Sequence, residues 1–168
     1  MSALEIEIDT LVEAGDWARI TDAAPLAERA TLAALEAADA DIPARTEIAI
    51  TFTDNAHIRV LNQQWRGMDK PTNVLSFPAA DLPEAALAEG IAQPLGDIIV
   101  ALETLEAEAE AEGKKVEHHL THLVIHGTLH LLGYDHIEDT EAEEMEELER
   151  QILEGLGIDN PYSLPLDD

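Results

Sequence analysis

The segment HGTLHLLGYDH, residues 126–136, restricts what this chain can fold into more than any other part of it. His126 and His130 are four residues apart, so on a helix their side chains lie one turn above each other on one face. Gly133 permits the left-handed turn that ends a helix, after which His136 can reach, from outside the helix, a metal ion that the other two histidines share. Three imidazoles with one open coordination position are typical of catalytic zinc, whereas structural zinc has four protein ligands. The spacing therefore predicts a metal site carried by the end of a helix.

The residue that follows the first histidine bears on the reaction. It is Gly127, where zinc peptidases of the HExxH type have a glutamate that takes a proton from water. Glycine cannot act as a base, which disfavours peptide hydrolysis. Phosphodiester hydrolysis depends less on that base, because a metal can polarise the phosphoryl group and generate hydroxide. It needs a positive charge near the phosphoryl oxygens, and Arg66 is the candidate because a guanidinium binds phosphate through two N–H groups.

The chain is strongly acidic, with 36 Asp and Glu against nine Lys and Arg and a formal net charge of -27. Taken alone, this charge argues against nucleic-acid binding. Five of the nine cations nevertheless lie near two short regions: Arg59, Arg66 and Lys70 fall within twelve residues, and Lys114 and Lys115 come just before the histidine segment. We interpret the acidic excess as solvated surface, which leaves room for a local basic cleft.

Cysteine usage and hydropathy indicate the compartment. There is no cysteine in the 168 residues, so disulfides and thiolate ligands are excluded and a reducing compartment is expected. No apolar run approaches the roughly 20 residues that span a bilayer, and the opening MSALEIEIDT does not resemble a signal peptide. We expect a cytoplasmic protein in which residues 1–168 form a single domain.

The apolar patterns predict an α+β fold, in which one small mixed β-sheet packs with about five helices. The histidine spacing indicates that one of these is a zincin-like metal helix. Strands are expected at residues 3–10, 46–53, 74–77 and 96–102, and helices at 25–40, 55–66, 103–112, 116–132 and 139–155. Residues 78–95 contain three prolines and are expected to form a loop. Within the helix 55–66, the spacing places Ile58, Leu61 and Trp65 in a core stripe.

A second distinctive segment is LNQQWRGMDKPTNVLSFP, residues 61–78, followed by LGDI at 95–98 and then by the histidine motif. Together these segments closely resemble the YbeY family of bacterial endoribonucleases, over roughly residues 45–155. The resemblance implies a metal-dependent, single-strand-specific endoribonuclease that acts in maturation of ribosomal RNA, notably at the 3′ end of the small-subunit rRNA, and in ribosome quality control. It implies single-stranded RNA as the substrate and the ribosome or ribosomal proteins as partners.

The resemblance also implies roles for individual residues. The family's three metal-binding histidines fall on His126, His130 and His136, and its functionally important arginine falls on Arg66. We therefore expect Arg66 and His126 to be catalytic. One zinc ion is the expected cofactor, although imidazole ligands also suit nickel, copper or iron. The nucleophile is either water or the RNA 2′-hydroxyl.

Other residues have weaker signals. Lys70 is expected to assist phosphate binding, and Asp135 either hydrogen-bonds a ligand histidine or shapes the turn. Asn73 is a candidate for the cleft lining, whereas His118 and His122 are interpreted as packing or surface histidines. Two alternative functions stay open: a metallohydrolase of another bond such as a peptide, and a non-enzymatic ribosome-assembly factor with a structural metal.

Overall fold

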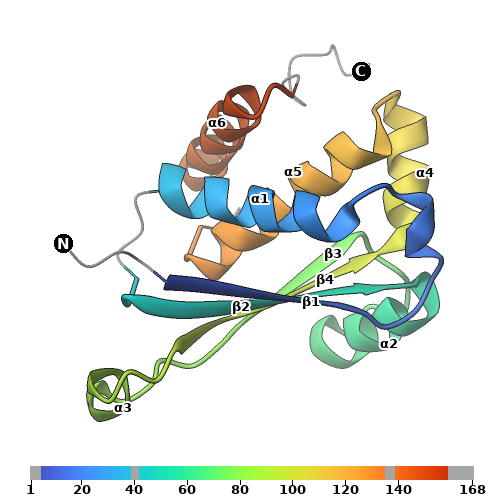
Figure 1. Ribbon diagram of the computed structural model, residues 1–168. Helices are drawn as coiled ribbons and strands as arrows, with labels where there is room; N and C mark the ends of the chain where they lie inside the picture. Colours follow the sequence, from blue (N-terminus) through green and yellow to red (C-terminus); the bar gives the residue numbers. More distant parts are fainter. Residues whose placement is uncertain (1–4, 39–41, 135–138, 159–168) are drawn as a thin grey trace.

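The computed structural model describes residues 5–38, 42–134 and 139–158, and its centre is a four-stranded sheet with helices on both faces (Figure 1). The strand order is β1-β2-β4-β3. Strands β1 (Glu5–Val12), β2 (Arg45–Thr53) and β4 (Gln93–Ala101) are parallel, and β3 (Val74–Pro78) is antiparallel to β4 at one edge. The predicted α+β class with one mixed sheet is confirmed.

The helices are distributed unequally over the two faces of the sheet. Figure 1 shows α1, α5 and α6 above one face and α2 below the other. The helical segments are η1 (Trp17–Arg19), α1 (Ala23–Ala37), α2 (Asn55–Arg66), α3 (Glu84–Ala88), α4 (Leu102–Glu112), α5 (Val116–Leu131) and α6 (Asp139–Gly155). The five expected helices are all present, and α3 is an additional short one. Within the described ranges, no helix combines the length and apolar character needed to cross a membrane.

Two apolar clusters hold the layers together. The larger cluster lies between the sheet and helices α1 and α5, and β2 contributes alternate side chains to it: Ile48, Ile50 and Phe52. The smaller cluster lies under α2, where Ile58 packs against Leu75 of β3. Because side chains alternate along a strand, β3 points Leu75 toward α2 and Ser76 toward α5. The edge strand β3 therefore borders both layers.

The segment 78–95 is not a loop throughout, so that prediction is wrong in part. Helix α3 forms within it, and β4 begins at Gln93 instead of residue 96. The buried Gln93 side chain ties the preceding loop to the sheet, because its Oε1 accepts from Leu82 N at 2.7 Å and its Nε2 donates to Ala80 O at 3.1 Å. Such bonds depend on tertiary structure and leave no periodic pattern.

Helix α2 begins and ends as its sequence predicts. The Asp54 side chain caps the first turn by accepting from His57 N at 3.0 Å. Gly67 ends the helix with a φ of 69°, in the left-handed region that glycine tolerates best. Arg66 is consequently the last residue of the helix, at its exposed end.

Trp65 is not a core residue, contrary to the predicted stripe. Its side chain is 69% exposed, whereas Ile58 is fully buried and Leu61 is partly buried. The last turn of α2 reaches the edge strand β3, where the sheet stops and Phe77 is the ring that meets the indole, at 5.7 Å between centroids. Helical spacing identified the face of α2 correctly, but the neighbouring layer ends before Trp65.

Candidate active site

A cleft of about 610 Å³ runs along the edge strand β3. It is lined by side chains from the end of α2, from the segment that leads into β3, and from the end of α5: Arg66, Thr72, Asn73, Val74, Leu75, Ser76, Pro78, His126, His130, Gly133 and Tyr134. Since α2 and α5 lie on opposite faces of the sheet, they meet only where the sheet ends. The cleft therefore brings Arg66 together with His126 and His130.

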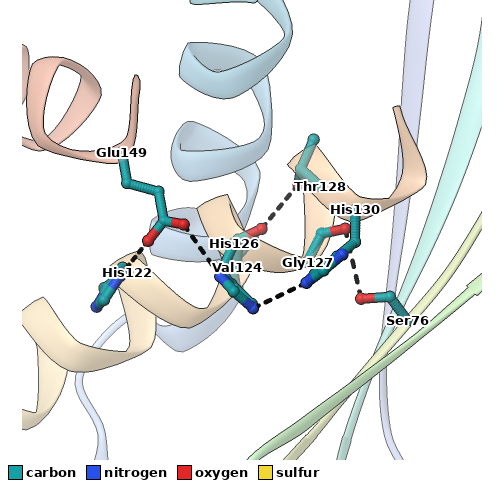
Figure 2. Close-up of polar contacts among 8 residues, drawn as sticks. All are labelled: Ser76, His122, Val124, His126, Gly127, Thr128, His130 and Glu149. Atoms are coloured by element: carbon teal, nitrogen blue, oxygen red, sulfur yellow. Dashed lines mark hydrogen bonds and ion pairs between the residues drawn. The ribbon is translucent and has the colours of Figure 1, made fainter. Parts of the chain in front are cut away.

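The two histidines face each other across one turn of α5 (Figure 2). Their Nε2 atoms are 3.0 Å apart, and the ring planes are inclined by 82°. Two ligands of a tetrahedral zinc ion, each at about 2.0–2.1 Å from it, lie roughly 3.3 Å apart, so this pair fits a single metal ion. His136 and Asp135 lie outside the described residues. Within the described part of the chain, no group of three or more histidine, aspartate or glutamate side chains is arranged to hold a metal.

Glu149 of α6 orients His126 from the side away from His130 (Figure 2). Its Oε2 accepts from His126 Nδ1 at 3.0 Å, and its Oε1 accepts from His122 Nε2 at 2.5 Å. Burial raises the pKa of Glu149, but the hydrogen bonds from His122 and His126 outweigh burial and lower this pKa to about 2. The carboxylate is thus ionised at neutral pH. It holds the His126 proton on Nδ1 and leaves the Nε2 lone pair directed at His130.

Sequence reasoning missed Glu149, although a signal for it was present. Met145, Leu148 and Ile152 form the apolar stripe of α6, and Glu149 falls on the same face, four residues after the first and three before the last. A carboxylate on a buried face requires partners. His122, interpreted from the sequence as a packing or surface histidine, is one of these partners.

Gly127 lies where α5 passes close to strands β3 and β4. It is buried, and a Cβ atom at this position would lie 3.1 Å from side-chain atoms of both Ser76 and Ile98. The Ser76 hydroxyl donates to Gly127 O at 3.4 Å (Figure 2). A glutamate side chain does not fit here unless the helix moves away from the sheet. Close packing therefore requires a residue without a side chain at position 127, where the HExxH pattern has its glutamate.

Arg66 presents its positive charge to the cleft. Its Nη1 donates to Oδ1 of the buried Asn62 at 3.3 Å, and Asn62 Nδ2 donates in turn to Lys70 O at 2.8 Å. In contrast, Arg59 of the same helix is paired with Asp69 at 2.8 Å. Across the described ranges, no carboxylate forms an ion pair with Arg66. Its guanidinium is thus held by a neutral amide and keeps its charge for an anion.

Lys70, which the sequence predicts to assist phosphate binding, does not line the cleft. It is exposed and lies four residues after Arg66.

The loop before β3 is anchored to α4 and α5 through Asn73, which lines the cleft. Asn73 Nδ2 donates to Glu108 Oε1 at 3.0 Å, and its Oδ1 accepts from Val74 N at 2.6 Å. The same Glu108 oxygen is 2.9 Å from Nε2 of the buried His119. Burial lowers the pKa of His119, against the opposing effect of its bond to Glu108. These contacts fix one wall of the cleft.

Comparison with known proteins identifies the family. The family model for Endoribonuclease YbeY matches residues 17–157. Endoribonuclease YbeY of Azorhizobium caulinodans is 59% identical over 160 residues, which cover 95% of this chain and 98% of the relative. Endoribonuclease YbeY of Bradyrhizobium diazoefficiens is 53% identical over 156 residues, covering 92% of this chain and 84% of the relative.

Among solved structures, the solution structure of TM1509 from Thermotoga maritima matches with a TM-score of 0.53 at 25% identity. The match covers 96% of this chain and 99% of that chain. The fold, the family model and the near full-length relatives agree with one another. This chain therefore belongs to the YbeY family of endoribonucleases, and the predicted enzyme class, a nuclease among the hydrolases, is confirmed.

Proposed function

We propose that residues 1–168 form one metal-dependent endoribonuclease domain that hydrolyses phosphodiester bonds of single-stranded RNA. The observation that carries this proposal is the meeting of two kinds of group in one cleft. His126 and His130 place their Nε2 atoms 3.0 Å apart, and Arg66 brings a guanidinium whose hydrogen-bond partner is a neutral amide. Phosphodiester hydrolysis needs both kinds of group: imidazoles that can bind a metal ion, and a cation that can bind phosphate.

The metal site would use His126 and His130 from α5, with His136 as the third ligand. Zinc is the proposed ion, because three imidazoles and an open position are typical of catalytic zinc; nickel, copper and iron also accept imidazole. When bound, the metal supplies a Lewis acid and lowers the pKa of water. Glu149 keeps the His126 proton on Nδ1, so that Nε2 is free of hydrogen on the metal side. Asp135 is proposed as a hydrogen-bond partner of a ligand histidine.

The phosphoryl group would be held by Arg66. A guanidinium stays charged at any physiological pH and can donate two parallel N–H bonds to phosphate oxygens. These bonds strengthen as negative charge develops on the oxygens in the transition state, which is the condition for catalysis. Lys70 would add positive charge beside the cleft for a neighbouring phosphate. The nucleophile is either water or the RNA 2′-hydroxyl.

In the cell, we propose that the substrate is ribosomal RNA, including the 3′ end of the small-subunit rRNA, and that the enzyme also acts in ribosome quality control. The proposed compartment is the cytoplasm. The net charge of -27 supports the ribosome or a ribosomal protein as a partner that raises the affinity for RNA. An acidic surface repels free RNA, so a partner that presents the strand would add to the affinity that the cleft provides.

Cleavage of a labelled single-stranded RNA by the metal-loaded protein tests this proposal. A His126→Ala protein purified in parallel should lose both metal and cleavage, which excludes a contaminating nuclease. Arg66→Ala should keep its metal and its unfolding temperature and lose roughly 10²- to 10³-fold in kcat, the usual effect of removing one preorganised donor. Arg59→Ala is the matched control, because Arg59 lies on the same helix and pairs with Asp69.

The outcomes separate the candidate functions. Equal cleavage by the wild type and His126→Ala would exclude a metal-dependent nuclease. Absence of cleavage by both, with free RNA and with ribosomal particles, would favour an assembly factor that acts without hydrolysis. Cleavage by Arg66→Ala at the wild-type rate would remove Arg66 from the mechanism. The end group of the product identifies the nucleophile, since a 2′,3′-cyclic phosphate forms only when the 2′-hydroxyl attacks.

A further inference from the structure

Trp65, which is exposed, and Phe77, which is partly buried, form an aromatic pair that the metal site and Arg66 do not explain. Their ring centroids are 5.7 Å apart, and their planes are inclined by 56°. Trp65 has the highest exposed fraction, 69%, of the large hydrophobic side chains that are exposed in the described part of the chain. The other tryptophan, Trp17, is 4% exposed. An indole left in water forgoes a large hydrophobic gain, which suggests a ligand that covers it.

Trp65 and Phe77 do not line the cleft themselves, but the residues next to them in the chain do. Trp65 directly precedes Arg66 in the last turn of α2, and Phe77 lies between Ser76 and Pro78 in β3. Arg66, Ser76 and Pro78 all line the cleft. A nucleotide whose phosphate contacts Arg66 would have its base near the indole, because the two side chains are carried by adjacent residues at the end of α2.

We propose that Trp65, supported by Phe77, is a stacking platform for one unpaired base of single-stranded RNA, next to the phosphate that Arg66 holds. This proposal rests on the proposed function, because it assumes that the cleft accepts RNA. The charge of the chain favours it: at a net charge of -27 with one unpaired arginine lining the cleft, phosphate contacts supply little affinity. Stacking is an uncharged contact that an acidic protein can offer to RNA.

The same contact distinguishes single strands from duplexes. The face of a base in a duplex is already covered by its neighbours, whereas an unpaired base can leave the strand and cover an aromatic ring. Every base has a π-face, so a platform of this kind accepts many sequences. Trp65 thus provides a physical basis for a single-strand preference.

The number of tryptophans makes the proposed stacking directly observable. The chain has two, and Trp17 is buried with its Nε1 donating to Thr53 O at 3.0 Å. We expect an oligoadenylate of 12 nucleotides, added to the full chain in the presence of a chelator, to quench the exposed indole saturably. Trp65→Phe, which retains Trp17, should show no quenching. Inorganic pyrophosphate should also cause none, because it offers phosphate without a base.

Affinity for the same labelled RNA, measured by anisotropy, gives a second test. Trp65→Ala should weaken binding roughly 5- to 150-fold, the range that corresponds to about 1–3 kcal/mol for one stacked base. Trp65→Tyr should stay within about threefold of the wild type, since it keeps an aromatic face. Val60→Ala is the matched control, because Val60 is 54% exposed on the same helix, and it should bind as the wild type does.

Three results would overturn the platform: no RNA binding by the chelated wild type, binding without quenching, or equal affinity of Trp65→Ala and the wild type. The test also separates this proposal from the nuclease proposal. Cleavage by the metal-loaded wild type together with an unchanged Trp65→Ala affinity would reject the platform alone. Quenching and weakened Trp65→Ala binding, with no cleavage by the wild type, would support the platform and reject the nuclease.

Discussion

Replacing Glu149 by glutamine tests whether this carboxylate orients the metal-facing histidine. Its two oxygens accept from His122 Nε2 at 2.5 Å and from His126 Nδ1 at 3.0 Å. Glutamine preserves the shape of the side chain, but its NH₂ group donates hydrogen bonds and cannot accept them. At least one of the two histidines must therefore lose its acceptor or move its proton to the other ring nitrogen.

The magnitude follows from the burial of the side chain. Glu149 is 0% exposed, so water does not replace a lost acceptor. A hydrogen bond to a charged group contributes about 1.5–3 kcal/mol, so we expect the free energy of unfolding to fall by about 2–3 kcal/mol. For a chain of this size, that loss lowers the unfolding temperature by roughly 5–10 °C. A proton moved to His126 Nε2 would block the metal side, and metal affinity should fall roughly 10- to 100-fold.

Two assays measure these effects separately: thermal unfolding of the metal-free protein, and competition with a chromophoric chelator for zinc. Glu147→Gln is the matched control, because it makes the same change on the same helix at an exposed carboxylate that pairs with Arg150 at 3.0 Å. We expect the control to change stability by less than about 0.5 kcal/mol. If Glu149→Gln binds zinc as tightly as this control does, the orienting role of the carboxylate is refuted, whatever happens to stability.

Three further predictions concern packing, titration and salt. Gly127→Glu, which restores the HExxH pattern, should lower the free energy of unfolding by more than about 3 kcal/mol in urea titrations, because it places a carboxylate in a closely packed position; a stable protein would refute the packing argument. The hydrogen bond that His57 Nδ1 donates to the Asp54 carboxylate raises the pKa of His57 above 6.5, so this pair stabilises the fold below pH 6.5 and loses its effect as pH rises through the raised pKa. NMR titration should show this pKa fall in Asp54→Asn. RNA affinity should decrease with salt with a log–log slope of only about -0.7 to -1.4, since Arg66 and, at a neighbouring phosphate, Lys70 each contribute about -0.7 on a single strand; a slope steeper than about -3 would reveal other cationic contacts.

Local spacing predicts only the part of the site that one helix carries. His126 and His130 are brought together by the four-residue repeat of α5, and this contact could be predicted without a fold. Arg66 joins them because α2 and α5 pack on opposite faces and meet at the β3 edge, a matter of sheet order that no local pattern contains. The contact of Glu149 with His126 requires α6 to dock on α5. Its charge on an apolar face was visible in the sequence, but its partner was not.

In the fold, too, local spacing predicts single elements but not the contacts between elements that are distant in the sequence. Strands and helices with strong periodicity lie close to their predicted positions, because one face of each is buried against another layer. Periodicity indicates which face of a helix is buried, but not where the covering layer ends. Trp65 was therefore assigned to the core although it reaches past the edge strand. The early start of β4 at Gln93 is accompanied by side-chain bonds from Gln93 to the preceding loop, which sequence periodicity cannot reveal.

The acidity of the chain and the chemistry of the cleft are compatible once the ion pairs are considered. Most cations are paired with carboxylates and offer little to RNA: Arg19 with Glu106, Arg45 with Glu5, Arg59 with Asp69, Lys114 with Glu112 and Arg150 with Glu147. Repulsion from the remaining acidic surface is screened beyond about 8–10 Å at physiological salt, so short-range contacts decide binding. A duplex carries twice the phosphate density of a single strand and presents no free base face, so it meets this repulsion without compensation. A single strand meets less repulsion and can bring a phosphate to Arg66, which has no carboxylate partner in the described ranges. The acidic surface that weakens RNA binding in general should therefore disfavour duplexes most.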